Sequence, residues 1–126
     1  MKMEIRCAVL ADEDPEDFYA DFEVSDAVIY SADVFDEVYD HFAGDYGYRS
    51  SDGEYFYRNR YHLQQTFLDL WERLNGRLDQ AETAGDEDLI KNTAIKLKAA
   101  WHLYTEMKKL TESFSETNWF AIRFID

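Results

Sequence analysis

The sequence has little cysteine, proline or glycine: one Cys, one Pro and five Gly in 126 residues. Because Cys7 stands alone, no disulfide can form within the chain and no cysteine-based zinc site can be assembled. The first residues contain no apolar stretch of signal-peptide length, and no run approaches the roughly 18 apolar residues of a membrane-spanning helix. We therefore expect a cytoplasmic protein without a membrane partner.

Positive charge is scarce in the first part of the chain. Residues 1–54 hold 16 acidic and three basic side chains, a net charge of −13, whereas residues 55–126 hold 11 acidic and ten basic ones, a net charge of −1. A field of this sign repels the phosphates of nucleic acids and membranes and attracts basic protein surfaces, with a strength that salt screens. We expect a basic protein surface as the partner and no direct binding of DNA or RNA.

The composition otherwise favours a folded protein. Hydrophobic residues make up 46% of the chain and aromatic residues 17%, despite a net charge of −14. A chain of this length is long enough for one core and short for two, so residues 1–126 are expected to form a single domain. The element pattern predicts an α+β fold, in which a small antiparallel sheet packs against three helices.

Three segments alternate apolar and polar residues with the period of two that is typical of half-buried strands. Residues 3–10 and 18–24 flank the acidic turn at residues 12–17, which predicts an antiparallel hairpin. Residues 118–125 predict a last strand that joins this hairpin. Residues 27–30 stay ambiguous, because their β-branched side chains favour a strand, whereas they could also belong to a longer helix.

Three segments have helical periodicity: residues 31–44, 59–84 and 86–114. Ser31 is a good N-cap for the first, and Gly44 can end it in the left-handed conformation. Asp86 is a good N-cap for the last. The side of that last helix expected to be buried consists of Leu89, Ile90, Ala94, Leu97, Trp101 and Tyr104.

The helix predicted over residues 31–44 separates into an apolar face and an acidic face. The acidic face consists of Asp33, Asp36, Glu37 and Asp40. Like charges three or four positions apart cost roughly 0.2 to 0.5 kcal/mol per pair, so this face is expected to lower stability. Mutual repulsion is expected to raise the pKa values of these acids, so that stability rises as the pH falls from neutral. We interpret this ridge as a mimic of nucleic-acid phosphates.

Other residues extend the predicted partner-binding surface. The additional acids are Asp21, Glu23 and Asp26. Residues 46–61 have a composition typical of binding surfaces, because tyrosine supplies contact area at low rotamer cost and arginine makes forked hydrogen bonds. The expected anchors there are Tyr48, Arg49, Tyr55, Tyr57 and Arg58. The dipeptide Asp52-Gly53 favours a small hairpin, with a plain loop as the alternative, and the tyrosines could instead pack on the domain.

These features together predict a non-catalytic inhibitor that blocks a basic, nucleic-acid-binding enzyme as a DNA or RNA mimic. In character the chain resembles the small acidic proteins with which phages block restriction or CRISPR nucleases, and the immunity proteins that neutralise nuclease toxins. The alternative for the acidic face is a solvated surface that maintains solubility or adapts the protein to high salt. Neither a cofactor nor a metal is expected.

Two alternatives come from other functional classes. Three histidines and one carboxylate could hold a divalent metal in an enzyme if their helices converge: His41, His62, His102 and Glu37. A second apolar side of the helix predicted over residues 86–114 could bind a partner or a second copy: Ile95, Leu103 and Leu110. The first alternative predicts stoichiometric metal in the purified protein, and the second predicts light scattering that depends on concentration.

Overall fold

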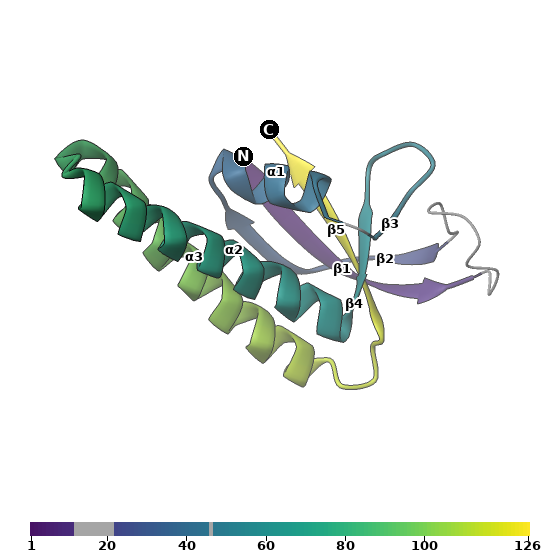
Figure 1. Cartoon of the computed structure of the whole chain (residues 1–126). Helices are drawn as coiled ribbons and strands as arrows, with labels where there is room; N and C mark the ends of the chain where they lie inside the picture. The colour runs from purple at the N-terminus through teal and green to yellow at the C-terminus, as the bar shows by residue number, and fades with distance from the viewer. Residues whose placement is uncertain (12–21, 46) are drawn as a thin grey trace.

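A computed structural model describes residues 1–11, 22–45 and 47–126 and shows a five-stranded antiparallel sheet with three helices (Figure 1). The strands are β1 (Lys2–Leu10), β2 (Phe22–Asp33), β3 (Tyr48–Arg49), β4 (Phe56–Asn59) and β5 (Trp119–Ile125). The helices are α1 (Asp36–Ala43), α2 (Arg60–Ala84) and α3 (Glu87–Ser113). The strand order β2-β1-β5-β4-β3 places the last strand between two hairpins. The predicted α+β fold is confirmed.

The first hairpin and the last strand pair as the sequence predicts. β1 runs antiparallel to β2 and to β5, so that Lys2 lies opposite Asp33 on one side and Ile125 on the other. β2 is longer than predicted, since it takes in the ambiguous residues 27–30 and continues to Asp33. The acidic turn and the beginning of the predicted second strand, residues 12–21, lie outside the described residues.

α1 begins at Asp36, so the prediction of a helix from Ser31 was wrong in its first turn. Ser31 and Asp33 belong to β2 and pair with β1. Strand pairing satisfies the backbone amides of these residues directly, whereas the first four amides of a helix have no partner within it. Phe35 occupies the N-cap position instead, and it makes no side-chain cap hydrogen bond.

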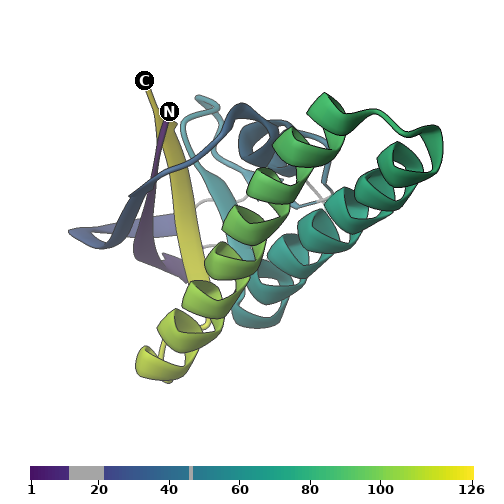
Figure 2. The ribbon, with the colours of Figure 1, turned by 90° about the vertical axis from the view of Figure 1, so that its left-hand side faces the viewer.

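The helices cover one face of the sheet and enclose the main core, with α2 and α3 lying side by side as a long antiparallel pair (Figure 2). The buried hydrophobic side chains of this core are Met3, Ile5, Val38, Phe42, Phe56, Leu63, Phe67, Leu70, Leu74, Ala100, Leu103, Met107, Leu110, Phe120 and Ile122. The pair formed by α2 and α3 extends well beyond the sheet at the turn that joins the two helices (Figure 1).

A second cluster of aromatic side chains lies on the other face of the sheet. Ala8, Tyr57 and Ala121 are buried there, and Phe22, Val24, Tyr48, Tyr55 and Trp119 pack around them. The ring centroid of Phe22 on β2 is 4.2 Å from that of Tyr57 and 6.2 Å from that of Tyr48 on β3. Because β2 and β3 are the two edge strands, the sheet is curled until its edges meet through these rings.

The ends of the two long helices agree with the sequence signals. The side chain of Asn59 accepts from the His62 amide at 2.7 Å, and that of Asp86 accepts from the Leu89 amide at 3.2 Å. Gly85 separates the helices with φ 72°, a conformation that favours glycine. Among the described residues, no helix combines the length and apolar character needed to cross a bilayer.

The side of α3 that enters the core differs from the prediction. Leu103 and Leu110, expected on an outward side, are buried, whereas Trp101, expected in the core, is 48% exposed. Ile95 is 64% exposed, so it forms no shared apolar face with the two leucines. α3 has apolar residues on most of its circumference, and packing against the sheet selects the side that carries Ala100.

Candidate partner-binding surface

The acids predicted to form one ridge lie on two elements. Asp33 ends β2, whereas Asp36, Glu37 and Asp40 lie on α1. Asp33, Asp36 and Asp40 are exposed, and none of them forms a salt bridge with a described residue. Asp33 is the strand partner of Lys2, but their side chains form no salt bridge in the described structure. These three side chains remain available to a partner.

Glu37 differs from the other three acids because two helices hold it. Its carboxylate is 2.5 Å from Arg77 of α2 and 2.6 Å from Lys96 of α3. Partial burial acts to raise the pKa of Glu37, but hydrogen bonds from Lys96 and Arg77 outweigh this effect and lower the pKa from its ordinary value. The expected increase in pKa was therefore wrong for Glu37, which serves as a tether for α1.

The short helix α1 presents different residues on each side. At about 100° per residue, Asp36 and Asp40 share the outer side, Val38 points into the core, and Tyr39 and Glu37 lie on opposite flanks. Tyr39 is 40% exposed. Helical periodicity places Tyr39 with the apolar residues of α1, but its ring also borders the acidic side, and the phenol is suited to such a position at the water boundary.

A cleft of about 560 Å³ lies between Tyr39 and the turn that joins β3 to β4. Its lining residues are Tyr39, Gly53, Glu54, Phe56, Arg123, Phe124 and Ile125. The Tyr39 ring makes edge-to-face contacts with Phe124 at 5.4 Å and Phe56 at 6.1 Å between centroids. Arg123 donates to Glu54 at 2.6 Å and to Glu4 at 2.9 Å, and these bonds raise its pKa, so its charge is permanent and already neutralised.

The side of the cleft opposite α1 is a turn organised by Asp52. The Asp52 carboxylate accepts from the Ser50 hydroxyl at 2.6 Å and from the Glu54 amide at 2.9 Å, and both bonds lower its pKa. The predicted hairpin is confirmed, but a backbone bond from Ser50 to Tyr55 closes a longer turn than the expected two residues. We call the exposed acids Asp33, Asp36, Asp40 and Asp52 the acidic rim.

The remaining acids of the predicted surface lie elsewhere. Glu23 and Asp26 are exposed near the start of β2, where Glu23 pairs with Val9. Asp33 ends the same strand, and at about 3.3 Å of rise per residue the two regions are well separated. Asp21 lies outside the described residues. The structure therefore divides the predicted acidic surface into separate parts.

The tyrosine-rich segment packs most of its predicted anchors onto the protein. Tyr57 is only 4% exposed, and the Tyr48 ring lies edge-on to Trp119 at 5.8 Å. Tyr55 is partly exposed and stacks on Tyr57 at 6.3 Å. Arg49 donates to the last carbonyl of α1 at 2.5 Å. These contacts give the segment mainly a structural role.

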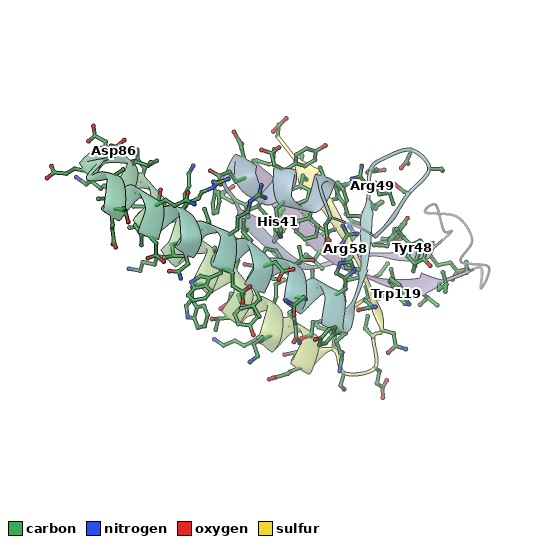
Figure 3. All side chains as sticks on the ribbon, viewed as in Figure 1. His41, Tyr48, Arg49, Arg58, Asp86 and Trp119 are labelled. Carbon is green, nitrogen blue, oxygen red and sulfur yellow. The ribbon has the colours of Figure 1, made fainter. Side chains whose placement is uncertain are left out.

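Arg58 has no exposed surface, so it cannot serve as an anchor in this arrangement (Figure 3). It donates to the carbonyls of Tyr57 at 3.0 Å and Phe42 at 3.3 Å, and its Nε lies 3.5 Å from the Asp45 carboxylate. Burial lowers the pKa of Arg58, an effect that Asp45 opposes. Alternation along β4 places Arg58 on the same face as the core residue Phe56, a signal that could have predicted its burial.

The residues of the alternative metal site are not brought together. His62 pairs with Asp45 at 2.8 Å, His41 lies 3.5 Å from an Arg73 nitrogen, and His102 is exposed on α3. Within residues 1–11, 22–45 and 47–126, no group of three or more His, Cys, Asp or Glu could hold a metal ion. The metal-enzyme alternative therefore loses the site on which it was based.

Comparison of the chain with protein-family models, curated proteins and solved structures finds no match. The most distinctive surface of the chain combines the acidic rim with a cleft whose walls are aromatic.

Proposed function

We propose that this protein is a non-catalytic, cytoplasmic inhibitor that docks its acidic rim on the basic surface of a nucleic-acid-binding enzyme. The observation that carries the proposal is that Asp33, Asp36 and Asp40 are exposed and form no described salt bridge. The nearby acids Glu4 and Glu37, in contrast, each bind two basic side chains. Among these five acids, Asp33, Asp36 and Asp40 are therefore the ones left for external cations.

Charge supports the proposal in two ways. An excess of negative charge accelerates association with a positive groove, and the rate falls as salt increases. Cations of the partner would also relieve repulsion between neighbouring rim acids. Because Asp33 lies on β2 and not on α1, the four acids do not follow one helix, and the proposed mimicry is one of negative charge rather than of a regular phosphate spacing.

The proposal includes two biological settings. An enzyme of restriction or CRISPR defence and a nuclease toxin both bind nucleic acid in a positively charged groove. The acidic rim would occupy the basic groove of either enzyme in the same manner. The protein would then be a phage inhibitor in the first setting and an immunity protein in the second. The identity of the captured enzyme separates these settings.

The test compares two charge-reversed variants. The first, called the acidic-rim variant, reverses three of the four rim acids: Asp33→Lys, Asp36→Lys and Asp40→Lys. The matched control carries Glu72→Lys, Asp79→Lys and Glu82→Lys on the exposed side of α2. The wild type and each variant are immobilised and incubated with host lysate at low and high salt. Bound proteins are identified by mass spectrometry, and inhibition of the captured enzyme by each protein is then measured. Circular dichroism establishes that both variants are folded.

We expect the wild type and the control to capture and inhibit one nucleic-acid enzyme in a salt-dependent manner. The acidic-rim variant should lose both effects, because it replaces attraction by repulsion at the docking surface. Equal capture and inhibition by the two folded variants would contradict the proposal.

A further inference from the structure

We infer that the cleft beside Tyr39 binds an arginine side chain of the basic partner, an inference that rests on the proposed function. The cleft lies between α1 and the β3–β4 turn, and its volume of about 560 Å³ is ample for one side chain. Tyr39 lines it from α1, the helix that also carries the exposed acids Asp36 and Asp40, and Glu54 lines it from the β3–β4 turn. A cation attracted to the acids of α1 therefore approaches the element that forms one wall of the cleft.

Aromatic rings give the cleft a surface suited to a guanidinium group. Tyr39, Phe56 and Phe124 line the cleft and contact one another edge to face. Tyr39, which is 40% exposed, offers most of the accessible ring surface, because Phe56 is only 4% exposed. The Tyr39 hydroxyl makes no hydrogen bond within the described part of the chain, so it is available to a ligand. A planar guanidinium stacks on such rings while its stem packs against apolar atoms.

The carboxylates of Glu4 and Glu54, together with the acids of α1, outnumber the cations Arg123 and Arg49 in this region, which favours a cation over an anion as the ligand. Arg123, the basic residue among the lining side chains, is already bound by Glu54 and Glu4. Glu54 uses Oε1 for that bond, and its side chain is 43% exposed. Its second oxygen can therefore accept from an incoming guanidinium, which forms stronger bonds with carboxylates than neutral donors do.

The protein uses the same type of contact elsewhere. The guanidinium carbon of Arg49 lies 4.9 Å from the Phe56 ring centroid, and that of Arg123 lies 5.7 Å from the Tyr55 centroid. Both contacts border the cleft, since Phe56 and Arg123 line it. An arginine from a partner would extend this alternation of arginine and aromatic groups. A lysine ammonium would gain the charge but not the planar stacking.

The experiment uses N-acetyl-L-arginine amide as the probe. It is titrated into the ¹⁵N-labelled full chain and followed by two-dimensional NMR, beside the matching lysine and leucine amides. Arginine amide should saturate in the millimolar range with its largest shifts at Tyr39, Gly53 and Glu54. Lysine amide should bind more weakly, and leucine amide should leave these resonances unchanged.

Three variants separate the cleft from general charge. Tyr39→Leu keeps an apolar side chain and should weaken arginine amide about three- to ten-fold, the range expected for loss of a partly exposed cation–π contact. Tyr39→Phe should retain more of the binding than Tyr39→Leu does, because the ring remains and only the hydroxyl contact is lost. The control Tyr61→Ala removes a tyrosine that is 74% exposed on α2 and should change nothing.

Two results would overturn the inference: equal shifts for arginine and leucine amides, or unchanged arginine affinity in Tyr39→Leu. Either result, combined with loss of enzyme capture in the acidic-rim variant, would leave the proposed function standing. If arginine amide fills the cleft but the acidic-rim variant still captures and inhibits its enzyme, the arginine site is supported and the proposed function is overturned.

Discussion

Gly47 lies directly against the guanidinium of Arg58. A Cβ atom at position 47 would overlap Nη1 of Arg58 and stand 2.6 Å from its Cζ. Arg58 cannot move aside easily, because its buried nitrogens donate to the carbonyls of Phe42 and Tyr57. Leaving such donors unpaired costs more than a typical hydrogen bond contributes. The glycine thus permits a buried cation to connect β4 with the end of α1.

Gly47→Ala should therefore lower the free energy of unfolding by about 2 to 3 kcal/mol, through displacement of Arg58. The matched control is Gly76→Ala in α2, where an added Cβ has no atom within 4 Å. That change should raise the free energy of unfolding by roughly 0.5 to 1 kcal/mol, because alanine is the better helix former. Urea unfolding followed by circular dichroism measures both, and similar effects of the two changes would contradict the argument.

Phe22→Ala should weaken the contact between the two edges of the sheet. The Phe22 ring packs on Tyr57 at 4.2 Å and on Trp119 at 5.0 Å, so its removal should cost about 3 kcal/mol. Tryptophan fluorescence should shift to longer wavelength as Trp119 gains water. The control Val28→Ala, at a 41% exposed position of the same strand, should change stability by about 0.5 kcal/mol or less. An unchanged fluorescence spectrum for Phe22→Ala would mean that the contact between the edge strands β2 and β3 does not depend on the Phe22 ring.

Glu37→Gln should lower stability at neutral pH by about 1 kcal/mol, because it weakens the bonds to Arg77 and Lys96. The folded pKa of Glu37 lies below the ordinary value of 4.5, so the stabilisation is complete above that value and is lost as the pH falls through the folded pKa. The difference between wild type and variant should therefore shrink below pH 4.5. Asp40→Asn, at an exposed acid without a described salt bridge, is the control and should have little effect.

The half-buried position of His41 predicts a second loss of stability in acid. Burial is the largest influence and lowers the pKa of His41 from 6.5, with a smaller contribution from Arg73 and opposition from a Thr66 backbone hydrogen bond and from Asp45 and Asp69. The unfolded chain therefore takes up a proton first, and stability falls as the pH drops below 6.5 until the folded pKa is reached.

Melting temperatures measured from about pH 7 to about pH 5.5 check this prediction. His41→Gln should reduce the decrease in melting temperature that accompanies the fall in pH. His102→Gln, at an exposed position, should leave this decrease unchanged. This direction is opposite to the one expected from repulsion along a single acidic helix. A melting temperature that rises as the pH falls would instead support the expectation that repulsion among the acids of α1 and Asp33 dominates the pH dependence.

Local signals in the sequence were sufficient for the first hairpin, the last strand and the two long helices. The N-cap at Asp86 acts within a few residues, so it can be recognised without the fold. The prediction that Gly44 ends its helix in the left-handed conformation was wrong, since Gly44 has φ −90°. Alternation also places Phe120 and Ile122 on one face of β5, and both are buried. The predicted fold class depended on these local features.

The errors occurred where distant residues decide the outcome. Ser31 fits a helix cap by its chemistry, but the partner that holds it in β2 is Glu4, far away in the sequence. α3 has two usable apolar sides, and the sheet determines that Leu103 enters the core while Trp101 does not. The candidate surface was predicted only in part, since Asp36 and Asp40 share a side of α1 but the cleft beside Tyr39 requires three separate elements.

The tether at Glu37 has a consequence for recognition. Its bonds to α2 and α3 exist in the free protein, so α1 holds Asp36, Asp40 and Tyr39 in place before a partner arrives. Little conformational entropy then remains to be lost on docking, which favours slow dissociation. Replacing Glu37 would shorten the lifetime of a complex without removing a single intermolecular contact, which distinguishes preorganisation from charge as the source of affinity.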